Sequence, residues 1–180
     1  MVKIFSLSVV LAPPSGSCTV LSNATDLSSF SFYQRGSVGE FMTFLSRTVA
    51  ERTPQAEQLA AVIITDQEYP VRPAFSLLTK ILDDFTAKVP QSSFSNPSAI
   101  SFSEINGYIQ RYQDPRQADT IMKVQQELDE TKIVLHKTIE SVLERGEKLD
   151  NLVERSTALS AQSKMFYKTA KKQNSCCVIM

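Results

Sequence analysis

The sequence predicts an α+β domain followed by a long α-helical coiled-coil segment. A shift in composition indicates the division, and a heptad repeat in the second part supports it. All eight prolines and thirteen of the fifteen aromatic residues lie at or before Pro115. The residues after Pro115 contain a single glycine, Gly146. Such a shift marks an architectural boundary near Asp114. We therefore expect a globular domain over residues 1–113, a coiled-coil segment over 114–174 and a short tail over 175–180.

The overall composition restricts the class of protein. The formal net charge is zero, so no global field attracts nucleic acid. Three cysteines, two of them adjacent, do not make a disulfide framework and favour a reducing compartment such as the cytosol. The chain has no run of about eighteen apolar residues, which a membrane-spanning helix needs. Its first residues alternate and carry a single lysine, which favours a strand over a signal peptide.

The first part of the domain has the pattern of a hairpin and a helix. Residues 2–10, VKIFSLSVV, are rich in β-branched and aromatic side chains and predict a strand. Residues 18–23, CTVLSN, follow a proline–glycine turn and predict the returning strand. Residues 38–52 place apolar side chains at helical spacing. These side chains are Phe41, Phe44, Leu45 and Val49.

The remainder of the domain continues this mixture of strand and helix. Residues 59–66, LAAVIITD, form a short apolar run that predicts a buried strand. Residues 68–89 predict a helix whose apolar stripe contains Phe75, Leu78, Leu82 and Phe85. Residues 89–101 are polar and contain prolines, so we expect a loop, and residues 100–113 predict a last short helix. Strands with helices packed against them define an α+β domain.

The second part of the chain carries a heptad repeat. It begins at Asp114, a plausible N-cap, with Pro115 in the first turn. An alternating spacing of three and four then holds one phase for more than six heptads, which predicts a coiled-coil seam. Several seam positions hold threonine or serine, so a bundle with bulkier partner helices is favoured over a two-stranded coil. The seam includes Leu135, Val142, Arg145, Leu149, Leu152, Ser156, Leu159, Ser163, Phe166 and Ala170.

Arg145 places a permanent charge at the centre of this seam. One interpretation is that its stem lies on the seam while the guanidinium extends into water. The other is a buried donor that requires acceptor side chains from partner helices. Because an unpaired buried charge costs several kcal/mol, only partners with acceptors at that level would be admitted. The central position favours this second interpretation.

The last four residues, Cys177 to Met180, match a prenylation box, and the terminal methionine favours farnesyl. Cys176 offers a second thiol for palmitate or a second prenyl group. One lipid gives marginal membrane binding, whereas two signals give stable anchoring. A basic cluster precedes the two cysteines and strengthens this prediction of a lipid anchor. The cluster consists of Lys168, Lys171 and Lys172.

The sequence contains no pattern typical of an enzyme. It lacks the GxxxxGK[ST] phosphate loop of a prenylated GTPase, and it lacks GxSxG and HExxH. Adjacent cysteines do not have metal-ligand spacing, and the one histidine, His136, is distant from them. We therefore expect no catalytic residue, no metal and no cofactor. The alternative function is a lipid-anchored coiled-coil tether or adaptor. In the sequence, only Arg145 distinguishes this alternative from a protein that enters a helical bundle, because a tether does not need a buried charge at the centre of its seam.

Residues 140–159, ESVLERGEKLDNLVERSTAL, resemble the SNARE motif of the arginine-type, synaptobrevin-like proteins. The resemblance implies a central layer in which Arg145 meets three glutamines from partner helices. It implies flanking layers at Val142 and Leu149, and further layers at Leu135, Leu152, Leu159 and Phe166. The function that it implies is membrane fusion through a bundle of four parallel helices. Its implied partners are glutamine-type SNARE helices on target membranes and a disassembly ATPase with its adaptor.

The first part resembles a longin domain, the profilin-like fold carried by some of these SNAREs. The likeness lies in SLSVV, in LSSFSFYQRGSVGEFMTF and in DQEYPVRPAFSLLTKILDDF. With the tail QNSCCVIM, the whole resembles the prenylated longin R-SNAREs. The resemblance implies an antiparallel sheet with helices on both faces. It places the protein in the cytosol when closed, and otherwise on the cytoplasmic face of Golgi, endoplasmic-reticulum-derived and endolysosomal membranes.

Two further expectations follow from the longin resemblance. This type of domain folds back over its own SNARE segment, and the expected groove includes Phe41 and Phe44, although both could be ordinary core residues. Longin domains of this type also have five strands, with one more strand before the VIIT-type strand. Here only ERTPQAEQLA separates the first helix from that strand. Either the helix is extended or the sheet is one strand short.

Overall fold

The computed structural model describes residues 3–13, 17–53, 58–114, 141, 143 and 147–175. Within them, a three-stranded antiparallel sheet has the order β2-β1-β3. The strands are β1 (Ile4–Leu11), β2 (Thr19–Thr25) and β3 (Leu59–Thr65). β1 pairs with both neighbours, so the hairpin expected from the sequence is confirmed. None of the described helices is both long and apolar enough to cross a bilayer.

The strand β3 differs from the sequence prediction. We expected a buried strand, but only Val62 is fully buried and the other residues are half-buried. The physical reason is position, because β3 is an edge strand among the described residues and pairs only with β1 there. α1 (Phe32–Arg52) continues to within seven residues of β3. The first helix ends at Arg52, as the sequence predicted, and does not continue through the described residues before β3. The described residues hold three strands where the longin resemblance implies five.

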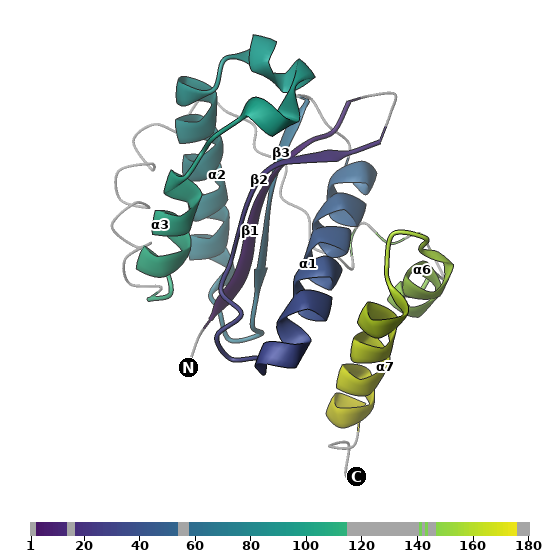
Figure 1. Ribbon diagram of the computed structural model, residues 1–180. Helices are drawn as coiled ribbons and strands as arrows, with labels where there is room; N and C mark the ends of the chain where they lie inside the picture. Colours follow the sequence, from purple (N-terminus) through teal and green to yellow (C-terminus); the bar gives the residue numbers. More distant parts are fainter. Residues whose placement is uncertain are drawn as a thin grey trace.

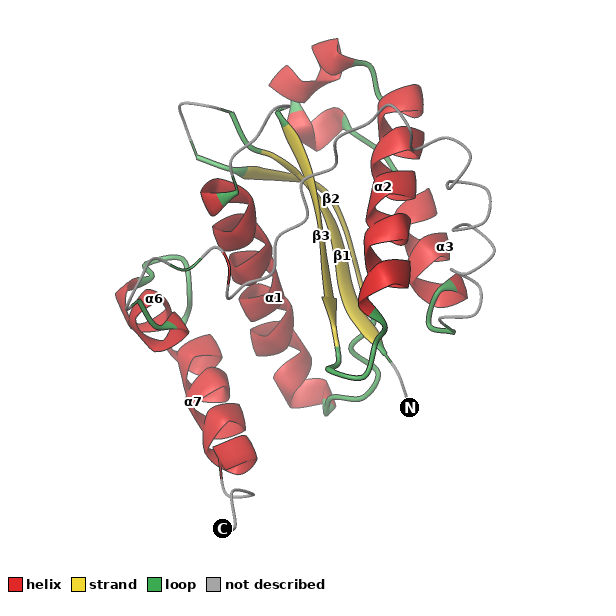
Figure 2. Ribbon diagram, turned by 180° about the vertical axis from the view of Figure 1, so that it is seen from behind, coloured by secondary structure: helices red, strands yellow, loops and turns green. Residues whose placement is uncertain are grey.

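Helices cover both faces of the sheet (Figures 1 and 2). α1 lies on one face, and α2 (Val71–Lys88) and α3 (Glu104–Arg111) lie on the other. The expected loop between α2 and α3 contains two short 3₁₀ turns, Gln91–Ser95 and Pro97–Ala99. The sheet thus has a helical layer on each side, as the fold prediction requires.

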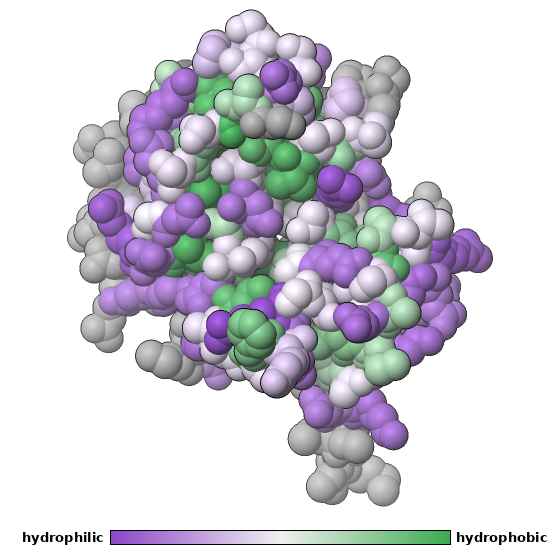
Figure 3. All heavy atoms as spheres, viewed as in Figure 1, coloured by the Kyte–Doolittle hydropathy of each residue, from purple (hydrophilic) through white to green (hydrophobic). Residues whose placement is uncertain are grey.

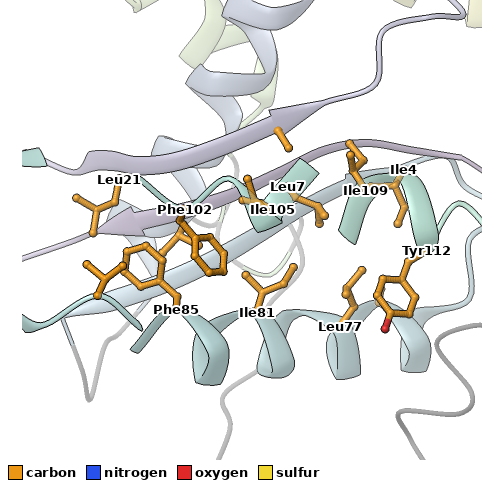
Figure 4. Close-up of a cluster of buried hydrophobic side chains, with 14 of the residues drawn as sticks. Ile4, Leu7, Leu21, Leu77, Ile81, Phe85, Phe102, Ile105, Ile109 and Tyr112 are labelled. Carbon is orange, nitrogen blue, oxygen red and sulfur yellow. The ribbon is translucent and has the colours of Figure 1, made fainter. Parts of the chain in front are cut away.

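The main core lies between the sheet and α2 with α3 (Figure 4). Ile4 and Leu7 of β1 are fully buried there, and Phe85 of α2 packs against Phe102 at 5.2 Å between ring centroids. The stripe predicted for α2 was offset by one residue, except at Phe85. The buried row consists of Ala74, Leu77, Ile81 and Phe85, whereas Phe75, Leu78 and Leu82 are half-buried at its side.

α1 approaches the opposite face of the sheet through small side chains. Ser46 is fully buried, and its hydroxyl lies 3.2 Å from the hydroxyl of Ser8 on β1. One turn further along α1, Ala50 packs against Val10 of β1. Serine and alanine at these positions let the helix backbone lie close to the sheet, with the polar hydroxyls paired to each other. The bulky side chains Phe41 and Phe44 belong to a different cluster.

The C-terminal part of the chain forms α6 (Leu149–Arg155) and α7 (Ala161–Ser175), which lie outside α1 in Figure 1. The heptad predicts one continuous helix here, but the described chain is interrupted between the two helices. Ser160 caps the second helix, because its hydroxyl oxygen accepts the backbone N–H of Ser163 at 3.2 Å. The described part of the heptad, residues 147–175, thus lies against the domain as two shorter helices.

Candidate functional site: the contact between α1 and the α6–α7 segment

The centre of this contact is apolar. Phe41 of α1 is 8% exposed, and it packs with Val153 of α6 and Leu159 of the connecting turn, which are 1% and 6% exposed. Phe44 and Leu149 are partly buried against the same cluster. Because this cluster is separate from the core between the sheet and α2, its burial depends on the α6–α7 segment.

Aromatic side chains extend the contact along α7. The Phe41 ring lies 5.3 Å from the ring of Tyr167 and 6.3 Å from the ring of Phe166, between centroids. Phe166 also meets Phe30, which precedes α1, edge-on at 6.0 Å. These separations lie in the range in which aromatic pairs attract each other beyond simple area burial. Phe41 is therefore the residue of α1 on which both α7 rings converge.

A polar contact connects the start of α7 to α1. The Glu40 carboxylate accepts hydrogen bonds from the backbone N–H of Ser160 at 2.5 Å and from its hydroxyl at 2.7 Å. The hydroxyl of Ser163, which is fully buried, donates to the same carboxylate at 2.5 Å. The hydrogen bonds from Ser163 and Ser160 lower the pKa of Glu40 below its usual value. A carboxylate beside Phe41 thus holds the N-terminus of α7 in place.

An ion pair connects the far end of α1 to Glu147, which lies two residues before α6. Arg52 and Glu147 form a two-pronged pair, in which the second guanidinium nitrogen lies 3.0 Å from a carboxylate oxygen. The two side chains are 26% and 21% exposed. Such forked pairing orients both groups. The contact with α1 therefore has a polar link at Glu40 and another at Arg52, with the aromatic cluster between them.

Polar contacts also hold α6 and α7 to each other. The Tyr167 hydroxyl donates to Asp150 at 2.9 Å, and burial together with this carboxylate raises the pKa of Tyr167 to about 12. Lys168 pairs with Glu154 at 2.8 Å, and Lys171 pairs with Asp150. These contacts close the angle between the two short helices. They can form only when the chain bends between α6 and α7, because in one continuous helix the paired side chains would lie far apart.

The structure brings together part of the predicted site. Phe41, Phe44, Leu149, Leu159 and Phe166 all belong to or pack against one cluster. Leu152 lies in α6 and is half-buried. Several predicted site residues lie outside the described residues, so their places are not assigned. They are Leu135, Val142, Arg145, Cys176 and Cys177.

Sequence reasoning missed the polar contacts, and among the apolar and aromatic residues it missed Val153 and Tyr167. Glu40 and Ser160 are 120 positions apart, and no local pattern connects them. Val153 lies beside the seam, yet it is the most deeply buried apolar residue of the contact. The one available signal was the serine-rich stretch around Ser156 and Ser160, whose side chains favour helix caps over helix interiors. The regular heptad spacing outweighed that signal.

Comparisons with known proteins define the class of this protein. The synaptobrevin family model matches residues 120–178, and the regulated-SNARE-like longin model matches residues 55–109. The chain is 54% identical to the synaptobrevin homolog ykt6 of Schizosaccharomyces pombe, over 98% of this chain and 99% of that protein. It is 54% identical to synaptobrevin homolog YKT6 of Saccharomyces cerevisiae and 56% to that of Debaryomyces hansenii, over 89% of this chain and 91% of each relative.

The longin fold and these matches define a longin-type R-SNARE, a non-enzymatic protein of membrane fusion that acts with other SNARE helices. The chain belongs to the synaptobrevin family, together with the fungal ykt6 homologues that it matches over nearly its full length. The resemblance to a longin-type R-SNARE, drawn from the heptad and the longin-like segments, is therefore confirmed.

Proposed function

We propose that the chain contributes one helix, with Arg145 in the central layer, to a four-helix bundle, and that its longin domain regulates this assembly. The other three helices would come from glutamine-type SNAREs on a target membrane. Burial of the Arg145 charge requires acceptors from those helices, which gives the bundle its register. A disassembly ATPase with its adaptor would then separate the four helices, so that each can enter a new bundle.

The observation that supports regulation is the identity of the residues in contact with α1. Leu159 and Phe166 are predicted bundle layers, and both lie against Phe41 or its neighbours. Leu149 and Ser163 are seam residues as well, and they meet the same helix through the apolar cluster and through Glu40. A side chain that packs on α1 cannot pack in a four-helix bundle at the same time. We infer that the described state is autoinhibited.

The test is a glutamate at Phe41, compared with a matched control on the same helix. Phe41→Glu places a charge in the buried cluster and should release α6 and α7, because an unpaired buried charge is costly. Phe32→Glu is the control, since Phe32 is 79% exposed. Assembly with glutamine-type helices should accelerate roughly tenfold or more for the Phe41 variant only, in proportion to the open population.

Two outcomes of this test would contradict the proposal. Equal assembly rates for the Phe41→Glu variant and the unmodified chain, with the fold intact by circular dichroism, would refute autoinhibition. Failure of every glutamine-type set to form a heat-resistant complex would favour the tether or adaptor alternative. Replacing Arg145 by leucine should weaken register selection among partner sets, which a tether would not show.

We also propose that the protein is anchored through lipids on its tail. Cys177 would carry a farnesyl group, and Cys176 a palmitoyl or second prenyl group, because the residues from Cys177 to Met180 match a prenylation box. Two lipid groups would anchor the protein stably to a membrane, whereas one lipid group would give reversible membrane binding. The closed form would then reside in the cytosol and the open form on the cytoplasmic face of Golgi, endoplasmic-reticulum-derived or endolysosomal membranes. Mass spectrometry of the mature C-terminus tests the lipids directly.

A further inference from the structure

The lysines of α7 share one face of the helix and turn towards α6. Lys164, Lys168 and Lys171 follow helical spacing, and Lys172 lies next to the last of them. The Lys164 ammonium group donates to the backbone carbonyl of Glu154 at 2.9 Å. Together with Asp150 and Glu154, several of these lysines line a hollow of about 430 Å³ between α6 and α7. In this state the lysine face meets the acidic side chains of the preceding helix.

The acidic partners of these lysines are specific. Lys168 pairs with Glu154 at 2.8 Å, and Lys171 pairs with Asp150, which also accepts the Tyr167 hydroxyl at 2.9 Å. The partners hold the pKa of Asp150 and of Glu154 below its usual value and raise that of Lys168. Figure 3 shows hydrophilic side chains over this side of the molecule, down to the end of the described chain. Lys168 and Lys171 are thus neutralised by α6 in the closed state.

These pairs cannot survive when α6 and α7 become one helix. At a rise of 1.5 Å per residue, a continuous helix would place Lys168 about 21 Å from Glu154 and Lys171 about 31 Å from Asp150. Both separations exceed the screening length of about 8 Å at physiological salt. The transition to a continuous helix, which rests on the proposed function, therefore removes the acidic partners from the lysine face.

The exposed lysine face would remain accessible inside a four-helix bundle. At about 100° per residue, the lysines centre roughly 150° around α7 from the seam residues Ser163, Phe166 and Ala170. Bundle formation would therefore bury the seam and leave the lysines outside. α7 ends immediately before Cys176, where the proposed lipid anchor would hold it beside a bilayer. The surface that lies next to such a helix is the headgroup layer, and its anionic lipids attract lysine.

We propose that the lysine face of α7 (Lys164, Lys168, Lys171 and Lys172) binds an anionic membrane surface, and that Asp150 and Glu154 mask it in the closed state. The acidic pair acts as an internal substitute for lipid phosphate and carboxylate groups. Anionic lipid competes with that pair, so it binds the open form better and draws the equilibrium towards opening. Membrane contact and SNARE release are then coupled through the same two carboxylates.

The experiment uses the full chain with Cys176→Ser and Cys177→Ser, so that no lipid group contributes, and no partner helices are added. Sedimentation with vesicles compares pure phosphatidylcholine with a mixture containing about one-third phosphatidylserine. The paired substitution Asp150→Asn and Glu154→Gln should tighten binding to the anionic vesicles several-fold and leave neutral vesicles unchanged. Adding Lys168→Gln and Lys171→Gln should weaken it about 25-fold, since each lysine near the surface contributes about fivefold.

A matched control is available in another exposed ion pair. Lys88 pairs with Glu104 at 2.6 Å, on the opposite side of the sheet from α1. Glu104→Gln frees one lysine without opening the α6–α7 angle, so it should leave vesicle binding unchanged. Equal binding of the unmodified chain and the Asp150 and Glu154 variant to anionic vesicles would overturn the proposal. An equal gain on neutral vesicles would also overturn it, because exposed apolar surface would then be the cause.

These outcomes are separate from those of the autoinhibition test. That test measures assembly with glutamine-type helices in solution and needs no membrane. A Phe41→Glu variant that assembles quickly, combined with no vesicle binding by the charge variants, would reject only the lysine-face proposal. Vesicle binding that depends on the lysines, without faster assembly of the Phe41 variant, would reject only autoinhibition.

Discussion

The two faces of α1 pack by different physical means. The inner face meets the sheet through small side chains, such as Ser46 beside Ser8 and Ala50 beside Val10. The outer face carries Phe41, whose cover is the α6–α7 segment. The small side chains at these two positions let the helix backbone lie close to the sheet, whereas the large aromatic rings outside form a cluster that another segment completes. The same helix therefore belongs both to the fold and to the contact on which the proposed autoinhibition rests.

The largest expected effect comes from the inner side of the helix. Met42 is 7% exposed and lies one turn before Ser46, on the row that faces the sheet. Met42→Ala should lower the free energy of unfolding by about 2–5 kcal/mol, because it leaves a cavity in the domain. Urea unfolding followed by circular dichroism measures this, since the chain has no tryptophan. An unfolding free energy unchanged by the substitution would contradict the assignment of this face to the core.

Val153 contributes to the closed contact but not to the predicted bundle layers. It is fully buried against Phe41, and it lies beside the layer positions in the sequence. Val153→Asp should release α6–α7 and accelerate assembly without weakening the finished bundle. Leu159→Asp should release the segment equally but destabilise the bundle, because Leu159 is a predicted layer. Assembly rate and bundle melting temperature distinguish the two variants. Identical behaviour of both would show that the closed contact and the bundle do not use different residues.

Acid should weaken the closed contact through Glu40. Its pKa is lower in the closed form than in the open form, because Ser163 and Ser160 donate to the carboxylate. The contribution to closure is therefore complete above the ordinary pKa of about 4.5 and is lost as the pH falls through the lowered value. Glu40→Gln should reduce closure at neutral pH and remove the part of the acid dependence that Glu40 contributes, leaving the part due to Asp150 and Glu154. Interdomain fluorescence transfer between pH 7 and 3 measures both, and an unaltered acid profile in the variant would exclude Glu40 as its cause.

The smallest expected effect is at the far end of the contact. Arg52 and Glu147 are partly exposed, and such pairs contribute less than about 1 kcal/mol. Glu147→Gln should therefore raise the open population by a factor of about five or less, and high salt should reduce the difference. Limited proteolysis of the segment near residue 147 measures the open population. An effect larger than that of Val153→Asp would place the main closing interaction at the ion pair and not at the aromatic cluster.

The sequence predicted the elements of the fold better than their faces. Alternating β-branched residues were sufficient to predict β1 and β2, and their hairpin is confirmed. The pattern did not predict which row of α2 meets the sheet, because apolar residues occupy half of that helix and fill two adjacent rows. Ala74 and Leu77 face the core, while the larger Phe75 and the neighbouring Leu78 lie at its side. Periodicity identifies such a helix but does not select the buried row when two adjacent rows are apolar.

The site was predictable where side chains are large and not where they are polar. Phe41 and Phe44 were expected to line a groove from a family resemblance, and both lie in the cluster with α6–α7. The role of Glu40 was not expected, because its partners Ser160 and Ser163 are about 120 residues away in the sequence. The heptad predicts one continuous helix, the form that the α6–α7 segment would take in a bundle with partner helices. It contains no information on the bend at Ser160, which depends on the contact with α1.

The most direct test of the account is the distance between α1 and α7 in solution. Spin labels at the exposed positions Arg47 and Gln162, with the three native cysteines replaced by serine, report it by double electron–electron resonance. A single short and narrow distribution is expected for the free chain, with a shift to long distances after Val153→Asp or after addition of glutamine-type helices. A broad long-distance distribution in the unmodified free chain would contradict the claim that α6–α7 is held on α1.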